Sequence, residues 1–241
     1  MVQYSGTEKA RTVSRMFGRI ASRYDTGNRV LSMGRDQRWR RQAVKLLDPK
    51  PGQRILDLGA GTGDLSLEIA PLVESVVALD ISGPMVKLGA QKAGKAGAAD
   101  KVGFVVSDGL QLPIPDRAFD AVATAFTIRN LASIEDGFAE IFRVLKPGGR
   151  MVCLEFTKPR SKLFSAVYLP YLNHILPFLG GRITGDPDAY RYLASSITEF
   201  TTAESLAGYL RRAGFLRVSW KTLNMGTVAI HTAQKPRTAK C

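Results

Sequence analysis

The chain has 241 residues, 45% of them apolar and 23% charged, which is typical of a globular protein able to bury a sizeable core. Its two cysteines, Cys153 and Cys241, are too few for a disulfide framework or a cysteine-ligated zinc site. No run of about 18 apolar residues and no apolar leader are present, so we expect neither a spanning helix nor a signal peptide.

The net charge of +13 is concentrated near the two ends of the sequence. Residues 1–50 contain twelve basic and four acidic residues, and residues 235–241 contain three basic residues and no acidic one. Basic ends favour a polyanionic partner, either nucleic acid or an anionic membrane surface. The alternative is a solvated surface that aids solubility.

Strands and helices alternate from residue 53 onward. Strands are expected at 54–58, 75–80, 102–106, 119–126 and 151–156, with helices at 64–72, 85–95 and from Ser133 to a turn at 146–149. A helix at 204–213 then precedes strands at 215–220 and 227–232, joined by a turn at 224–226. The pattern predicts one α/β domain over 1–241, with a Rossmann-like, seven-stranded, mostly parallel sheet and one antiparallel edge strand.

Two segments lie outside this alternation. Residues 1–50 are expected to form a helical cap, and residues 157–203 form a long insertion after the fifth strand. Both can cover the carboxyl edge of the sheet, where ligands bind in open α/β folds.

The sharpest motif is a glycine-rich turn between the first strand and the following helix. Its order is Gly-x-Gly-x-Gly, and Asp64 follows at the start of the helix, which disfavours a pyrophosphate. Asp80 ends the next strand, where a carboxylate can accept hydrogen bonds from ribose hydroxyls. These features favour S-adenosylmethionine over NAD. The expected cofactor-binding residues are Gly59, Gly61, Thr62, Gly63, Asp80, Ile81, Asp108 and Gly109, with a turn role as the alternative for Asp108.

The chain closely resembles the menaquinone/ubiquinone biosynthesis C-methyltransferases from Val13 to His231. The motifs that carry the resemblance are Tyr24-Asp25, Arg129-Asn130, Leu154-Glu155-Phe156 and Tyr190-Arg191-Tyr192-Leu193. Ala125 departs from the family pattern at a position often held by a cofactor-contacting serine. The resemblance implies a class I methyltransferase that methylates a polyprenylated quinol, either demethylmenaquinol or the corresponding benzoquinol of the ubiquinone pathway.

Methylation of a ring carbon requires a polarised ring hydroxyl and a route for protons, and it needs no metal. Arg129 and Asn130 follow the fourth strand and are the expected catalytic residues, with Arg129 stabilising a developing phenolate. The expected substrate-binding residues are Tyr24, Asn28, His174, Tyr190 and Arg191. For Tyr24, Asn28, His174 and Tyr190 the alternative is a structural role. Residues 163–180 are expected to wall a pocket for the prenyl tail or to form a buried subdomain core.

A helix is expected over 11–24. Val13, Phe17, Ile20 and Tyr24 share one face, and Arg11, Arg15, Arg19 and Arg23 form an adjoining stripe. The helix either lies on an anionic membrane or turns its apolar face inward as a lid, and the two alternatives are compatible. We therefore expect a cytoplasmic protein in peripheral contact with the membrane.

Other functions fit the sequence less well. A nucleic-acid methyltransferase would carry a proline-rich base-stacking turn after the fourth strand, and this chain has Phe126-Thr-Ile-Arg-Asn130 there, so we expect no nucleic-acid partner. Two alternatives stay open. One is a methyltransferase of another small aromatic or lipid substrate, and the other is a non-catalytic S-adenosylmethionine-binding component of a quinone biosynthesis complex. A homodimer is also left open.

Overall fold

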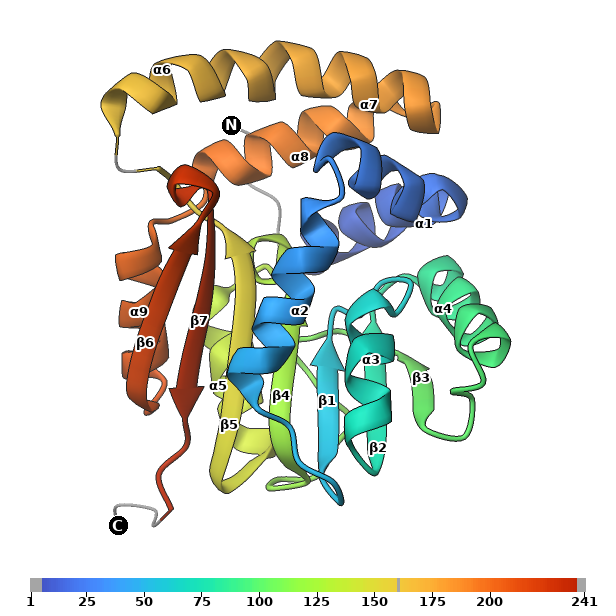
Figure 1. Ribbon diagram of the computed structural model, residues 1–241, viewed down its shortest axis with the longest axis vertical. Coiled ribbons are helices and arrows are strands. Elements are labelled where there is room, and N and C mark those ends of the chain that lie inside the picture. The colour runs from blue at the N-terminus through green and yellow to red at the C-terminus, as the bar shows by residue number, and fades with distance from the viewer. Residues whose placement is uncertain (1–5, 160, 238–241) are drawn as a thin grey trace.

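The computed structural model describes residues 6–159 and 161–237 and builds them around one seven-stranded sheet (Figure 1). The strands are β1 (Arg54–Leu58), β2 (Ser75–Asp80), β3 (Val102–Val106), β4 (Phe119–Ala125), β5 (Leu145–Phe156), β6 (Leu216–Leu223) and β7 (Val228–Gln234). Their order is β3-β2-β1-β4-β5-β7-β6, and only β7 pairs antiparallel, with β5 and β6. The predicted mostly parallel sheet with antiparallel pairing at one edge is confirmed, with β6 as the edge strand itself.

Helices cover both faces of the sheet because its central strands are apolar on both sides. One face packs against α2 (Arg35–Leu47), α3 (Asp64–Ile69) and α4 (Gly83–Lys95), and the other against α5 (Ile134–Val144) and α9 (Ala203–Arg212). Helix α5 begins as the sequence predicts, because the Ser133 hydroxyl accepts a hydrogen bond from the backbone N–H of Asp136 at 3.1 Å.

Strand β5 begins at Leu145, six residues before the predicted start. The turn at 146–149, predicted to end the preceding helix, lies within the strand as an irregularity, and α5 already ends at Val144. Leu145 pairs with Phe119, and the register then shifts so that Arg150 pairs with Ala121. Gly148 has φ +80°, a conformation that glycine adopts without strain.

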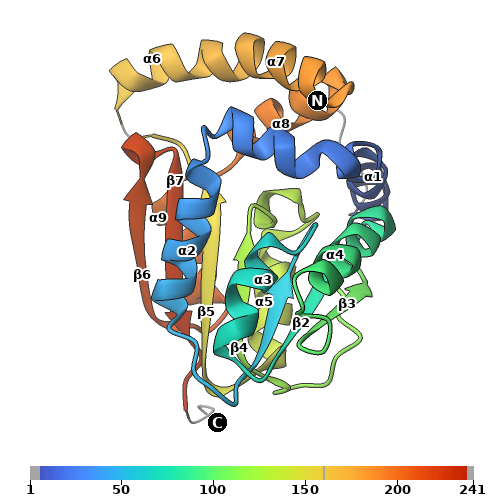
Figure 2. The ribbon, with the colours of Figure 1, turned by 45° about the vertical axis from the view of Figure 1, so that its right-hand side comes forward.

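A further layer of helices lies across the carboxyl ends of the parallel strands (Figures 1 and 2). It consists of α1 (Gly6–Leu31), α6 (Lys162–Pro170), the π-helical turn η3 (Tyr171–Ile175), α7 (Leu176–Thr184) and α8 (Pro187–Glu199). Met16 and Ile20 of α1 pack into one buried cluster with Leu172, Leu176 and Ile197 of the insertion. The two segments that lie outside the strand–helix alternation therefore pack on each other above the sheet.

Three 3₁₀ turns complete the described chain: η1 (Ala70–Leu72), η2 (Ile128–Asn130) and η4 (Asn224–Gly226). The turn η4 joins β6 to β7 where a hairpin-like turn is predicted. No helix within residues 6–159 and 161–237 is both long and apolar enough to cross a bilayer.

His231 on β7 makes the stability of the fold depend on pH. Its ring is buried, its Nε2 lies 2.8 Å from the carbonyl oxygen of Ala203, and burial lowers its pKa to about 4. The unfolded chain therefore binds a proton below about pH 6.5 that the folded chain binds only near pH 4. This part of the stability is present above pH 6.5 and is lost as the pH falls toward 4.

We expect His231→Gln, which keeps a donor for Ala203 and cannot titrate, to remove this pH dependence. Between pH 7 and pH 4, the unfolding free energy of the wild type should fall by about 3 kcal/mol more than that of the variant. Urea unfolding at the two pH values measures the difference. Equal losses in both proteins would contradict the assignment.

Candidate active site

The glycine-rich turn after β1 is held in place by backbone and side-chain contacts. Gly59 and Gly61 have φ values of +71° and +57°, which favour glycine. The Gly59 N–H donates to the Leu79 carbonyl at 2.7 Å, and the Thr127 hydroxyl donates to the Gly59 carbonyl at 3.2 Å. A Cβ atom on Gly59 would overlap the Thr127 side chain. The turn therefore places backbone atoms that no side chain covers at the carboxyl end of the parallel strands.

Asp80, at the end of β2, connects this turn to the start of α4. Its carboxylate accepts hydrogen bonds from the N–H groups of Gly61 at 2.9 Å and Ser82 at 2.8 Å. Burial raises the pKa of Asp80, and these two hydrogen bonds act in the opposite direction. The carboxylate is therefore oriented by the backbone before any ligand binds.

The first cavity, of about 730 Å³, lies above this turn. Its lining includes six of the predicted cofactor-binding residues: Gly59, Gly61, Asp80, Ile81, Asp108 and Gly109. Met85 and Leu110 add an apolar wall. Two carboxylates beside an apolar wall suit a nucleoside with hydroxyl groups and no phosphate, so the residues present fit S-adenosylmethionine.

Two other predicted cofactor residues do not line this cavity. The Thr62 hydroxyl donates to Asp25 at 2.5 Å and is buried, while Gly63 caps α3 with φ +83°. Both residues support the conformation of the turn without lining the first cavity. Asp108 lines the cavity and also accepts a hydrogen bond from the Leu110 N–H at 3.0 Å, so its turn role and its position in the cavity coexist.

The second cavity, of about 1300 Å³, lies between α1, α2 and the insertion. Its walls are largely apolar and aromatic, and they include the predicted residues Tyr24, Asn28, Arg129 and Tyr190. Burial raises the pKa of Tyr24, so its hydroxyl stays protonated and can donate. Phe17, Tyr24 and Phe126 line both cavities. The two spaces therefore meet at these three rings.

His174 and Arg191 line neither cavity. His174 lies on η3 with its side chain exposed, and Arg191 is exposed on α8, where it pairs with Asp188. Both predicted substrate residues point away from the second cavity, so they have no place in the substrate site proposed below.

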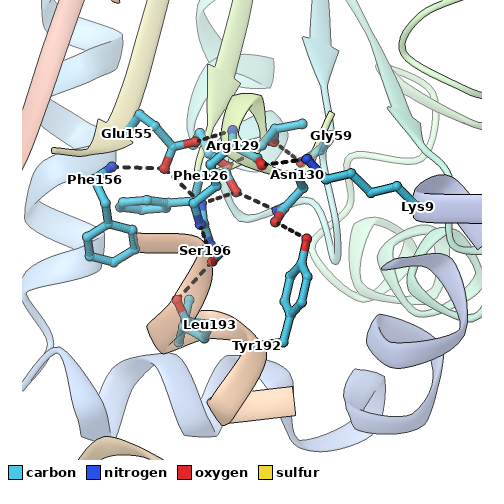
Figure 3. A network of polar contacts seen from close by, with 12 residues as sticks. Lys9, Gly59, Phe126, Arg129, Asn130, Glu155, Phe156, Tyr192, Leu193 and Ser196 are labelled. Atoms are coloured by element: carbon cyan, nitrogen blue, oxygen red, sulfur yellow. Dashed lines mark hydrogen bonds and ion pairs between the residues drawn. The ribbon is translucent and has the colours of Figure 1, made fainter. Parts of the chain in front are cut away.

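Figure 3 shows the polar network where the two cavities meet. The Arg129 Nη1 donates to the Glu155 carboxylate at 2.7 Å and also to the Phe126 carbonyl, and its Nε donates to the Ser196 hydroxyl at 3.3 Å. Asn130 accepts a hydrogen bond from the Tyr192 hydroxyl at 3.2 Å. Arg129 therefore lines the second cavity as half of a buried ion pair.

Sequence reasoning gave no role to Glu155 and considered Tyr192 only as part of the Tyr190-Arg191-Tyr192 motif, which suits a quinol ring or the packing of a lid. Burial raises the pKa of Glu155, and the Arg129 charge acts against that rise. The sequence does contain a signal for Glu155, because it is the only charged residue in the apolar run 151–156. A buried carboxylate is rarely unpaired, so a cationic partner could have been expected. Tyr192 directly follows Arg191 in the same motif, and only the packing of α8 shows that its hydroxyl reaches Asn130.

Helix α1 closes over the first cavity through contacts along its length. Lys9 donates to the Leu131 carbonyl at 2.6 Å, Ser14 to the Ile81 carbonyl at 3.0 Å, and Asp25 pairs with Lys92 at 2.8 Å. Val13 and Ile20 are each only 5% exposed. The apolar face of α1 is therefore turned inward as a lid and is not free to contact a membrane.

Comparison with known proteins gives consistent findings along the whole length. The model of the ubiE/COQ5 methyltransferase family matches residues 4–235. A demethylmenaquinone methyltransferase of Thermus thermophilus is 48% identical over 92% of this chain and 100% of its own. A ubiquinone/menaquinone biosynthesis C-methyltransferase of Stutzerimonas stutzeri is 42% identical over 95% and 91%.

Solved structures share the fold at much lower identity. A methyltransferase from Thermotoga maritima, described as dependent on S-adenosylmethionine, is 19% identical with a TM-score of 0.66, covering 92% of this chain and 99% of its own. The [4+2]-cyclase SpnF reaches the same TM-score at 22% identity, covering 84% and 81%. Since that protein is named for a different reaction, these likenesses support the fold alone.

We expect Asp80→Ala to weaken S-adenosylmethionine binding by about 1.5–3 kcal/mol, through loss of a charge-assisted hydrogen bond and of the contact that holds Gly61. Titration calorimetry measures the affinity. Asp116→Ala removes an exposed carboxylate away from both cavities and serves as the control. Unchanged affinity in a folded Asp80 variant would contradict the assignment.

Proposed function

Because the chain belongs to the ubiE/COQ5 methyltransferase family, we propose that it transfers the methyl group of S-adenosylmethionine to a ring carbon of a polyprenylated quinol. The observation that supports this most is the meeting of a cavity that contains the carboxylates of Asp80 and Asp108 with a larger, mainly apolar and aromatic cavity, at three shared aromatic rings. The acceptor is demethylmenaquinol, the corresponding benzoquinol of the ubiquinone pathway, or both, since the names of the relatives include each pathway.

The first cavity is the proposed cofactor site. When bound there, S-adenosylmethionine supplies a methyl group on a positively charged sulfur. We assign the ribose hydroxyls to Asp80 and the adenine to Asp108, Gly109 and the apolar wall that includes Met85. Helix α1 excludes water from above, because Phe17 and Tyr24 cover the junction of the cavities.

The second cavity is the proposed quinol site, with the ring at the junction and the tail among the aromatic side chains of α6 and η3 and Leu176 of α7. A guanidinium has five N–H donors, and three hydrogen bonds from Arg129 go to Glu155, Phe126 and Ser196. The remaining donors can polarise a ring hydroxyl. Asn130, oriented by Tyr192, would hold that hydroxyl or a water that takes its proton.

Turnover with soluble acceptors tests the proposal. Purified protein is incubated with S-adenosylmethionine and a short-chain demethylnaphthoquinol or benzoquinol under reducing conditions, and the products are analysed by mass spectrometry. We expect a product carrying one additional ring methyl from at least one acceptor. Failure to methylate either acceptor, by protein that binds S-adenosylmethionine, would overturn the proposed reaction.

Arg129→Lys separates the catalytic role of Arg129 from a structural one, because lysine keeps a cation for Glu155 and loses the planar fork of donors. We expect kcat to fall by about 100-fold or more while the cofactor affinity changes little. Arg143→Lys alters another arginine with two carboxylate partners, away from both cavities, and should leave kcat near normal. Normal turnover together with weakened cofactor binding would contradict the catalytic role and would show that Arg129 contributes to cofactor binding instead.

We also propose that the protein contacts anionic membranes through the stripe of arginines on α1. The stripe is exposed along the helix and consists of Arg11, Arg15, Arg19 and Arg23. The inward-facing side of the same helix lines the second cavity with Met16, Phe17 and Ile20. A prenylated quinol resides in the bilayer, so the enzyme must approach the lipid surface. Basic groups near such a surface contribute about 1 kcal/mol each, and salt screens them.

Replacing Arg11 and Arg15 with Gln tests this contact without disturbing the bonds of Arg19 to Asp186 and of Arg23 to Thr184. At low salt, binding to vesicles that contain anionic lipid should weaken by about 2 kcal/mol. The control is the paired replacement of Arg211 and Arg212 on α9, which changes the charge equally. An equal loss of binding in both variants would show that net charge alone, and not the stripe, is responsible.

A further inference from the structure

The segment α6–η3–α7 is apolar on both of its faces. Its inner face lines the second cavity with Phe164, Tyr168, Tyr171, Leu172 and Leu176. Its outer face carries exposed apolar side chains, with Leu163 83%, Val167 70% and Phe178 61% exposed. A helix that is apolar all round is normally buried, so something apolar is expected to cover this outer face.

The exposed apolar residues of the segment lie on one side of it. At about 100° of rotation per residue, Val167 lies four residues and Phe178 fifteen residues after Leu163, which places both within about 60° of Leu163. The extra residue of the π turn shifts Phe178 by about 100°, to within about 40° of Leu163 on its other side. The three residues therefore stay on one outer side of α6–η3–α7, the rod of helices at the top of Figure 1, and form an apolar stripe there.

The charges within the segment that carries this stripe are of one sign, since residues 159–185 contain basic residues and no acidic one. Arg182 lies at 4.6 Å from the Phe178 ring centre, and Arg23 of α1 donates to the carbonyl of Thr184 at the end of α7. Beyond α7, Asp186 is paired with Arg19, and Asp188 is paired with Arg191. An apolar stripe with a cationic end at α7 is complementary to an anionic lipid surface.

The second cavity reaches the surface beside the start of α6. Met33, 73% exposed, lines the cavity together with the exposed residues Arg35 and Asn224. Both ribbon views place η4, which contains Asn224, beneath the start of α6 (Figures 1 and 2). Met225 of η4 is also exposed. The entrance to the cavity is therefore adjacent to the apolar stripe.

We propose that the outer face of α6–η3–α7 inserts into the headgroup region of an anionic membrane and holds the entrance of the second cavity at the lipid surface. This rests on the proposed function, since the acceptor is then a lipid that passes from the bilayer into the cavity. A symmetric pairing of two copies with these helices parallel is disfavoured, because it would bring Arg182, Arg19 and Arg23 of both copies together. An antiparallel pairing of two copies is an outcome that the test below distinguishes.

The test uses the full-length protein and two matched double variants. Val167→Ser with Phe178→Ser removes apolar side chains from the outer face and touches neither cavity. Val106→Ser with Leu216→Ser removes exposed apolar side chains from β3 and β6 and is the control. Cosedimentation with vesicles of phosphatidylglycerol and phosphatidylcholine gives the partition coefficient, and size-exclusion chromatography with light scattering gives the oligomeric state.

We expect the outer-face variant to lose about tenfold or more in vesicle binding, and the control variant to bind like the wild type. Turnover of a short-chain quinol in vesicle-free solution should be unchanged in both. Unchanged vesicle binding in the outer-face variant would overturn the proposal, as would a wild-type dimer that this variant converts to a monomer. If the wild type binds vesicles but methylates no quinol, the proposed function fails while the membrane surface stands.

Discussion

The buried ion pair between Arg129 and Glu155 is the contact on which the site depends. Their nitrogen and oxygen lie 2.7 Å apart with side chains 4% and 0% exposed, and Ser196 bonds the same guanidinium from α8. The pair thus joins the ends of two neighbouring strands to the helices that cover them. Loss of one partner would leave a buried charge, which typically costs about 3–5 kcal/mol. Positioning of the proposed catalytic groups and stability of the helices that cover the site therefore share one interaction.

The cover itself is built from two segments that are distant in sequence. Helix α1 and the insertion pack on each other through Met16, Ile20 and Leu172, while Lys9 and Asp25 connect α1 to the sheet edge. The result is one wall shared by two adjoining cavities. In the proposed function, this wall brings a methyl donor that carries charge next to an acceptor with a long apolar tail and keeps water out of the junction.

The parts of this structure that sequence reasoning predicts best are local. The glycine turn and Asp80 follow from strand, turn and helix signals within a few residues, and the cap at Ser133 follows from a spacing of three. Glu155 meets Arg129 only because Ala125 pairs with Leu154 across β4 and β5, a matter of register that the sequence does not display. Likewise, helical spacing places His174 on the side of Leu163 and Val167, but the sequence does not display that this side faces outward, which depends on how the insertion packs over the sheet.

Cys153 illustrates a different demand on a protein that handles quinols. Oxidised quinones are electrophiles that add to thiolates, so a reactive cysteine near the substrate would be modified. Cys153 is fully buried on β5, and burial together with the nearby Glu155 raises its pKa well above the usual value. Within the described residues it is the only cysteine. The carboxylate that orients Arg129 thus also helps to keep this thiol protonated and chemically inert.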